Sequence, residues 1–522
     1  MNRRSDLTHY EGGRSRGGNL RRRSRRRRQV VTAVVRVLTV GAMAALVVAA
    51  GIVFLRRMAA ADDIPLRVID TEEVPVVGAV ITSPDGDTAE TDEDGLAALS
   101  FEAPAALSVS APGYHTGTFN VDVVPEDGLL HLQVDPVILQ GRVTSPDGIG
   151  LPGAAVSLGE MTTQTSEFGS FEFVRAVPGV IEVDKLAWEP AAVDWDGAEG
   201  RFDVTLEPFM VRGLRVGAAA AGTPGDFQTL LAIAEETMVN TLVFDTKQEE
   251  GTVLYDTQVQ EAHDIGAVNP RYDVETALRA ADERGLYTIT RIVTFQDGFR
   301  APARPDHAIW DSETGDLWRN GRGLTWMDPT DRGSWDYPIA LGLEACELGF
   351  DEIQFDYVRF PTDGDVTVTL YDVPVDQEVR TETIAAFLSE ARSQINEAGC
   401  AVSADIFAIV LSVTDDQGLG QMPEDLSYAV DAVSPMIYPS HYSPGWLGYD
   451  DPNAHPEEVV TQALDAGAPR FVGGAILRPW LQAFFYDASQ VHEQIAVAEE
   501  RGMGWMLWNA LSEFVDGAVP PE

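Results

Sequence analysis

The stretch GFDEIQFDYVRFP, residues 349–361, decides the fold of this chain of 522 residues. It is an apolar run of strand length that ends in polar and aromatic residues, Asp356, Tyr357 and Arg359, just before a proline. Side chains alternate along a strand, so Gln354 and Asp356 share one face, and Asp356 lies nearer the end. A charged side chain inside a buried strand is costly unless it is paired or functional. The stretch therefore predicts a strand that carries chemistry at its C-terminal end.

Similar apolar runs recur on both sides of this stretch, with helix-period segments such as 273–284 and 382–396 between them. A (β/α)8 TIM barrel over residues 211–516 is therefore expected, because eight β/α units over about 300 residues match that fold in number and size. A doubly wound open sheet is the alternative, but the chain has no GxGxxG or GxxxxGK loop. The eight predicted strands are 211–217, 241–246, 287–295, 352–360, 401–408, 432–438, 470–476 and 504–508.

Polar and aromatic residues gather at the ends of the predicted strands, where the active sites of TIM barrels lie. We expect them to surround one cavity at the C-terminal ends of the strands. A structural ion pair between Asp356 and Arg291 or Arg359 is the alternative to a functional Asp356. The candidate residues are Asp245, Lys247, Arg291, Asp356, Arg359, Asp405, Tyr438, His441, Trp480, Trp508 and Asn509.

Asp356 and Asp405 are the candidate catalytic residues, because carboxylates at the tops of neighbouring strands suit glycoside hydrolysis. Asp356 would be the nucleophile or charge stabiliser, and Asp405 the general acid/base, which needs a raised pKa. The other candidates would bind the sugar. Tryptophans in predicted loops (residues 310, 318, 326, 446 and 480) would stack on sugar rings. A catalytically silent, glycan-binding barrel and a purely structural surface protein are the other hypotheses.

Two related segments, 64–135 and 136–208, precede the barrel. Both contain TSPDG, at 82–86 and 144–148, and both have short alternating runs separated by Asp-Gly or Pro-Gly turns. This pattern is typical of β-sandwiches. The segments resemble the carboxypeptidase regulatory-like, immunoglobulin-type modules of secreted proteins, and we expect them to form a stalk.

The N-terminus is basic, with 14 Arg in residues 1–57, and residues 37–55 carry no charge. Nineteen such residues are long enough to span a bilayer. The arginines that precede this stretch predict a cytoplasmic tail, 1–29, and a single transmembrane anchor, 30–57, with the barrel outside the cytoplasm. A cleaved signal peptide and a secreted protein are the alternative.

Charge and cysteine content narrow the choice of partners. The net charge is −45, and the chain after the basic head is more acidic still, which argues against nucleic acid as a partner. No motif calls for a nucleotide or redox cofactor, and no HExxH or His/Cys cluster predicts a transition metal. The two cysteines, Cys346 and Cys400, fall near the same rim of the predicted barrel and form either one disulfide or two buried thiols.

From about 212 to 514 the chain resembles a family of barrel domains of unknown function that are grouped with glycoside hydrolases by analogy. The resemblance implies a TIM barrel. One departure is Gln248, where the family has an acid. The first stretch also resembles the strand-four signature of chitinase-like barrels, but Val358 replaces their catalytic Glu, so the substrate-assisted mechanism lacks its acid. The matching strings are VFDTK, RIVTFQD, GLTWMDP, GFDEIQFDYVRFP, SADIF, PMIYPSHY, DPNAHPEEVV, RPWLQAFF and GWMLWNA.

Overall fold

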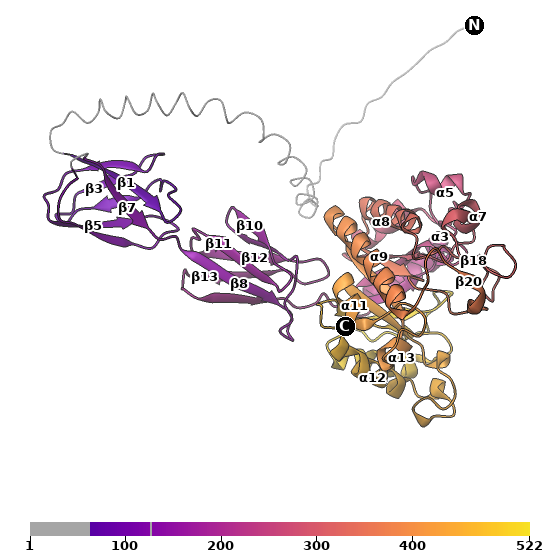
Figure 1. Cartoon of the computed structure of the whole chain (residues 1–522). Helices are drawn as coiled ribbons and strands as arrows, with labels where there is room; N and C mark the ends of the chain where they lie inside the picture. Colours follow the sequence, from indigo (N-terminus) through magenta and orange to yellow (C-terminus); the bar gives the residue numbers. More distant parts are fainter. Residues whose placement is uncertain (1–62, 126–127, 522) are drawn as a thin grey trace, which may run out of the picture. The chain divides into compact units, whose positions relative to one another are not determined.

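The structure is a computed structural model that describes residues 63–125 and 128–521. The chain divides into two units, Met1–Val137 and Ile138–Glu522 (Figure 1). Among the described residues, no helix combines the length and the apolar character that a membrane span requires. The predicted cytoplasmic tail, 1–29, and anchor, 30–57, lie outside the described residues.

The first unit contains two sheets, one of order β4-β1-β7 and one of order β3-β2-β5-β6. Their inward side chains share one core, which includes Leu66, Ile81, Leu107 and Leu132. This is the two-layer arrangement of a β-sandwich. The strands are β1 (Ile64–Asp70), β2 (Val80–Thr82), β3 (Thr88–Glu90), β4 (Leu96–Leu99), β5 (Ala105–Ser110), β6 (Gly117–Val121) and β7 (Leu130–Val134).

The second unit begins with another pair of sheets, of order β11-β8-β14 and β10-β9-β12-β13. Their strands are β8 (Ile138–Thr144), β9 (Ala155–Leu158), β10 (Met161–Gln164), β11 (Ser170–Val174), β12 (Gly179–Asp184), β13 (Ala191–Trp195) and β14 (Arg201–Thr205).

The two modules repeat a specific hydrogen-bond pattern. In the first, the Thr91 hydroxyl donates to the Val76 carbonyl and accepts from a backbone N–H twelve residues earlier. In the second, the Thr165 hydroxyl donates to the Leu151 carbonyl and accepts from a backbone N–H eleven residues earlier. The internal repeat seen in the sequence is therefore a structural repeat.

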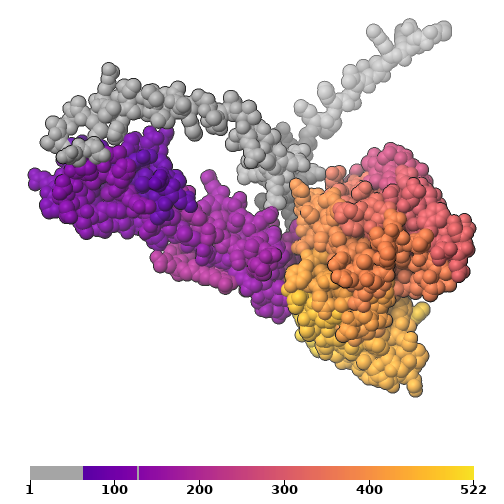
Figure 2. All heavy atoms as spheres, viewed as in Figure 1, coloured from indigo at the N-terminus to yellow at the C-terminus, as the bar shows by residue number. Residues whose placement is uncertain are grey.

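The rest of the second unit is a closed barrel of parallel strands, in the order β21-β19-β17-β16-β15-β25-β24-β22, with β21 paired to β22. Each strand except the last is followed by helical segments, and these cover the outside (Figure 1). Figure 2 shows the heavy atoms of the chain in the same view. The predicted TIM barrel is therefore confirmed. The strands are β15 (Arg212–Val216), β16 (Thr241–Lys247), β17 (Tyr287–Val293), β19 (Glu352–Asp356), β21 (Ala401–Phe407), β22 (Ala432–Ile437), β23 (Ile476–Leu477), β24 (Trp480–Gln482) and β25 (Trp505–Trp508).

The α-helices between these strands differ widely in length, from one turn to six. They are α3 (Ala218–Gly222), α4 (Pro224–Glu236), α5 (Gln260–Asp264), α6 (Val274–Asp282), α7 (Arg300–Ala303), α8 (Asp336–Leu348), α9 (Gln377–Ala398), α10 (Ile409–Ser412), α11 (Pro423–Ala429), α12 (Pro456–Gly467) and α13 (Ala488–Glu500). A two-stranded ribbon, β18 (Trp310–Asp311) with β20 (Thr369–Leu370), lies outside the barrel sheet.

Two predicted strands differ from the observed ones. The seventh strand was expected at 470–476, but Arg470 ends a 3-10 turn and the strand consists of β23 and β24, because Pro479 between them has no N–H to donate. The fourth was expected to reach residue 360 but ends at Asp356. Tyr357 follows with a φ of 49°, a left-handed conformation that a β-strand cannot contain.

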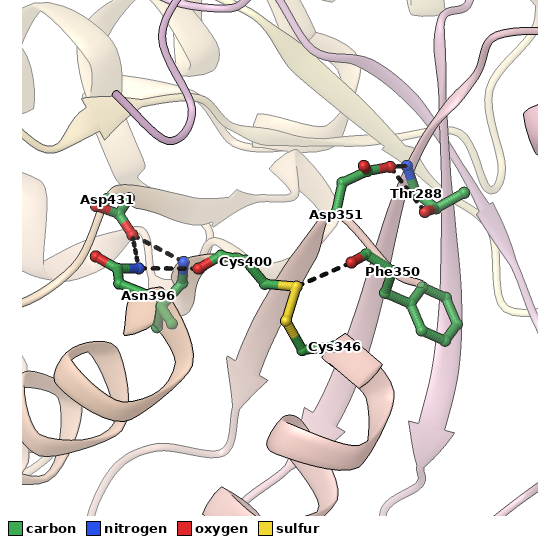
Figure 3. Close-up of a disulfide and its surroundings, with 8 residues drawn as sticks. Thr288, Cys346, Phe350, Asp351, Asn396, Cys400 and Asp431 are labelled. Carbon is green, nitrogen blue, oxygen red and sulfur yellow. Dashed lines mark hydrogen bonds between the residues drawn. A yellow bond between two sulfur atoms is a disulfide. The ribbon is translucent and has the colours of Figure 1, made fainter. Parts of the chain in front are cut away.

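Cys346 in α8 and Cys400 before β21 form a disulfide, so the first of the two alternatives for the cysteines is correct (Figure 3). The Cys400 sulfur lies 3.0 Å from the Phe350 carbonyl oxygen. Asn396 donates to the Cys400 carbonyl and to Asp431, at 2.9 and 2.8 Å. The disulfide thus ties helix α8 to the start of β21, at the N-terminal end of the strands.

The second module contacts the barrel at this same end. Lys185, which follows β12, is buried, and its Nζ lies 3.9 Å from an oxygen of Asp431, just before β22. Arg392 also pairs with Asp431, at 2.8 Å, and Asn396 and the Val402 N–H donate to it. The Phe209 ring, between the module and β15, lies 4.9 Å from the Tyr287 ring at the start of β17.

Candidate active site

Arg291 is the centre of a buried charge cluster at the C-terminal ends of the strands. It lies in β17 and is 1% exposed. Its guanidinium forms ion pairs with Asp356 of β19 at 2.7 Å, Asp245 of β16 at 3.3 Å and Glu249 at 2.6 Å. Three strand ends or loops are therefore joined by one side chain, and the guanidinium offers enough N–H groups to bond all three carboxylates.

Arg215 extends the cluster to the first strand. Its Nη2 lies 2.5 Å from the second oxygen of Asp245, so two arginines hold that carboxylate. The Trp508 ring of β25 lies beneath both guanidinium groups, with centroid distances of 4.4 Å to Arg215 and 5.1 Å to Arg291. Such cation–π contacts stabilise desolvated guanidinium groups. Strands β15, β16, β17, β19 and β25 thus contribute to one continuous cluster.

Asp356 is held in place on both oxygens. Arg291 donates to Oδ2 from Nε at 2.8 Å, and the Tyr357 backbone N–H donates to Oδ1 at 2.6 Å. These two donors, one on each oxygen, fix the orientation of the carboxyl group.

Asp405, on the neighbouring strand β21, has a different environment. It is 1% exposed, and burial raises its pKa well above its ordinary value, with a further rise from the negative charge of Asp356. The Trp480 indole N–H donates to Oδ1 at 2.8 Å. Oδ2 has no hydrogen-bond partner among the described residues, and it is not fully enclosed. Asp405 can therefore hold a proton on Oδ2, and this oxygen is free to form a hydrogen bond with a bound molecule.

Tyr438 and Trp480 complete this side of the barrel. Tyr438 is 5% exposed, and its pKa is raised by burial first and then by the charges of Asp405 and Asp356. Its ring lies 5.2 Å from the His441 ring and 5.5 Å from the Phe484 ring. The Trp480 ring meets the Trp508 ring edge-on at 5.3 Å, which links the two halves of the cluster.

Arg359 lies close to Asp356 but outside the ion-pair cluster. Its guanidinium lies 4.9 Å from the Trp326 and Phe407 ring centroids and 5.1 Å from that of Tyr357. Its Nη1 donates to the Phe360 carbonyl at 3.0 Å. The residue is 6% exposed, and burial lowers its pKa.

Besides Arg359, two further predicted site residues, Lys247 and Asn509, do not join the cluster. The Lys247 ammonium is fully buried and pairs with Asp297 at 2.9 Å, and it donates to the Val293 carbonyl at 2.7 Å. The Asn509 side chain accepts from the Leu511 N–H and donates to the Ala483 carbonyl, and only its backbone carbonyl lies near Arg215. The polar groups of both side chains are therefore used in contacts within the protein.

The loop tryptophans also differ from expectation. Trp318 and Trp326 are 1% and 0% exposed and pack inside the barrel core, so they do not offer faces to a sugar. Trp480 is equally buried and acts through its indole N–H. Trp310, 36% exposed, and the half-buried Trp446 keep open surface. The prediction of stacking tryptophans is therefore wrong for the three buried rings.

Two residues of the cluster, Arg215 and Glu249, were not predicted. Arg215 lies in the first strand, a short segment without a matching string, and alternation from Gly213 places it inward. Glu249 lies two residues past the end of β16, and Arg291 lowers its pKa to about 2. An acid close after the Asp-x-Lys string was the available signal for Glu249.

Another buried ion pair, between Glu352 and Arg478, lies at the opposite end of the barrel interior. Glu352 begins β19, and Ser403 and Tyr287 donate to it at 2.5 and 3.2 Å. Gln354, one step above it on the same face, contacts Ser403 and Ser434. The inner face of β19 is therefore polar from end to end, and Asp356 is its uppermost member.

Known structures resemble the chain to different extents. A hypothetical protein from Ruminiclostridium thermocellum is 33% identical over 37% of this chain and 96% of its own, with a TM-score of 0.34. Alpha-L-fucosidase isoenzyme 2 from Paenibacillus thiaminolyticus is 15% identical over 59% and 47%, with a TM-score of 0.40. An alpha-amylase from Lactobacillus plantarum is 16% identical over 58% and 71%, with a TM-score of 0.38. No curated protein sequence matches the chain.

The barrel sequence itself is more informative. Residues 213–514 match the family described as "Putative glycosyl hydrolase domain". The match covers more than half of the chain and runs from the first strand of the barrel to just beyond the last. It includes Arg215, Asp245, Arg291, Asp356 and Asp405. The chain belongs to this glycosyl hydrolase domain family.

Proposed function

We propose that the protein hydrolyses glycosidic bonds in a cell-envelope or extracellular polysaccharide, with Asp356 and Asp405 as its carboxylate pair. The observation that carries the proposal is the contrast between these two neighbouring residues. Asp356 accepts from a guanidinium and a backbone N–H, whereas burial raises the pKa of Asp405. A carboxylate held by an arginine, beside a carboxyl group whose pKa is raised, is a combination suited to glycoside hydrolysis.

Asp405 is the proposed general acid. Its proton rests on Oδ2, because Oδ1 accepts from Trp480, and it passes to the leaving glycosidic oxygen. Asp356 either attacks the anomeric carbon or stabilises the positive charge that develops there. Arg291, Asp245, Tyr438 and Trp508 shape the surroundings of both carboxyl groups.

The proposed location is outside the cytoplasm, either anchored through residues 30–57 or secreted after cleavage. The buried disulfide supports it, because structural disulfides form and persist in oxidising compartments. A fusion reporter placed after Glu522 should then be active outside the cytoplasm, and the length of the mature protein separates an anchor from a cleaved leader.

The test is a screen of the full-length protein against defined polysaccharides, with new reducing ends as the readout. Asp405→Asn and Asp356→Asn should each reduce turnover by about 10²-fold or more on any glycan that the parent cleaves. Glu352→Gln is the matched control, because it alters a buried carboxylate at the other end of the same strand as Asp356. Its folded fraction should keep the parent turnover.

Product stereochemistry and rescue distinguish the two roles of Asp356. Retention of the anomeric configuration with azide rescue of Asp356→Ala identifies a nucleophile, whereas inversion without rescue identifies a carboxylate that stabilises the charge while water attacks the anomeric carbon. Full activity of both asparagine variants would refute the carboxylate pair. Binding of a glycan that is never cleaved would instead establish a silent, glycan-binding barrel.

A further inference from the structure

All but one of the buried lysines and arginines in the described residues form an ion pair with a carboxylate. Seven lysines and arginines in this part of the chain are buried. Arg359 alone lacks an ion pair, although it lies three residues after Asp356. The other six each pair with a carboxylate: Lys185, Arg215, Lys247, Arg291, Arg300 and Arg478.

The hydrogen bonds of Arg359 are also incomplete. A guanidinium has five N–H donors, and the one bond that Arg359 makes in the described structure goes from Nη1 to the Phe360 carbonyl. Nε and Nη2 have no partner there, yet neither is fully enclosed. Three aromatic rings surround the group. The rings stabilise the cation without using its N–H groups, so the donors stay available to a ligand.

Other charges near Arg359 do not neutralise it. Asp356 and Asp363 attract the guanidinium and the exposed Arg322 repels it, but neither acid lies within ion-pairing distance. Asp356 is already committed to Arg291. A desolvated charge with no counter-ion is unfavourable in the free protein, and it becomes favourable when a ligand supplies the counter-ion.

We infer that Arg359 recognises a carboxylate carried by the sugar that occupies the site next to Asp356, so that the substrate is an acidic glycan. This inference rests on the proposed function, because it assigns the substrate of that same site. A planar guanidinium with free N–H groups matches the two oxygens of a carboxylate. The carboxylate of a hexuronic acid and that of a lactyl ether on an N-acetylhexosamine share this chemistry.

The charge of the whole chain makes a local contact necessary. At a net charge of −45 the long-range field repels an acidic glycan. Salt screens this long-range repulsion. It screens the contact between a buried guanidinium and a carboxylate much less, because that contact is short and lies in a medium of low dielectric constant. Affinity for the acidic sugar should therefore rise at moderate salt, and its preference over the neutral sugar should persist.

The experiment measures binding by the full-length protein to paired oligosaccharides. One pair is a hexuronic acid trisaccharide and its carboxyl-reduced form, and the other is an N-acetylhexosamine disaccharide with and without a lactyl ether. The parent should bind one acidic member about tenfold or more tightly than its neutral partner. Arg359→Met should abolish this preference, and Arg359→Lys should keep part of it. Whichever pair responds identifies the source of the carboxylate.

Thermal stability provides a second readout. A purely structural role of Arg359 would lower the thermal midpoint of its variants, whereas the ligand-binding role would not. Arg359→Met removes an uncompensated buried charge, so its thermal midpoint should equal or exceed that of the parent. Asp363→Asn is the matched control, because it neutralises the nearby acid and should leave the preference for the acidic sugar intact. A lower midpoint for Arg359→Met together with lost preference in Asp363→Asn would show that the two residues hold the loop, and would overturn the inference.

The outcomes separate this inference from the proposed function. Cleavage of a neutral glycan with equal binding of acidic and neutral partners leaves the hydrolase and overturns the role of Arg359. A preference for the acidic partner that depends on Arg359, without cleavage of any glycan, supports the inference and overturns the hydrolase.

Discussion

Removing the Cys346–Cys400 disulfide should destabilise the barrel by an amount that follows from the chain length it closes. The two cysteines are separated by 54 residues. A cross-link over a loop of this length lowers the entropy of the unfolded chain by an amount worth about 4 kcal/mol at 25 °C. The variant Cys346→Ala/Cys400→Ala should therefore lose about 4 kcal/mol of unfolding free energy. Small side chains at these sites avoid leaving buried polar groups, because both cysteines are buried.

The assay is urea unfolding followed by tryptophan fluorescence. All ten tryptophans lie in Ile138–Glu522, so the signal reports this unit alone. Protein made in an oxidising compartment should show no free thiols, and protein made in a reducing one should unfold like the double-alanine variant. An oxidised parent that unfolds within about 1 kcal/mol of the variant would refute the entropic estimate. Two free thiols in the native secreted protein would refute the disulfide itself.

Two further predictions concern buried charges. Because burial raises the pKa of Asp405 above its ordinary 3.8, the folded protein holds this proton more tightly than the unfolded chain. Its contribution to stability is complete below the unfolded pKa and is lost as the pH rises toward the folded one. Asp405→Asn should thus lose less stability than the parent between pH 4 and pH 8, measured as the change in thermal midpoint. Equal changes in the midpoints of the two proteins would contradict a raised pKa for Asp405. Asp431→Ala should lose about 3–5 kcal/mol in urea unfolding, because it leaves Arg392 and Lys185 without their carboxylate, whereas Lys185→Met should lose about 1 kcal/mol or less. Equal losses would show that Lys185 is the main partner of Asp431.

Much of the barrel could be predicted from its apolar runs, because buried parallel strands are nearly continuous in hydrophobicity. The positions of Asp356 and Asp405 near the C-terminal ends of their strands were also predictable, since each is a charged residue near the end of such a run. The seventh strand was misplaced because its two short pieces, around Pro479, do not form a run of ordinary strand length.

The position of Lys247 could not be read from alternation. Asp245 and Lys247 are two residues apart and would share a face of a regular strand. The structure has a register shift between them, where β16 pairs with β17. Asp245 therefore pairs with Arg215 and Arg291, whereas Lys247 pairs with Asp297. A bulge of this kind depends on the partner strand, which a single sequence does not reveal.

The aromatic residues show the same limit in another form. Trp326 and Trp480 were expected in loops, where a large ring suggests a surface for a sugar. Trp326 instead packs in the barrel core and lies over Arg359, and Trp480 supports Asp405. Composition identifies a site rich in aromatic rings, but the direction that each ring faces depends on tertiary packing.

The second module and the candidate site lie at opposite ends of the barrel. Lys185 meets Asp431 at the end where the strands begin, and Phe209 meets Tyr287 at that same end. Asp356 and Asp405 lie where the strands finish, so the module does not stand beside them. Replacing the module should therefore alter the barrel only at the end where Lys185 and Phe209 make their contacts. The hydrogen bonds of the two carboxyl groups, with Arg291 and with Trp480, should stay unchanged.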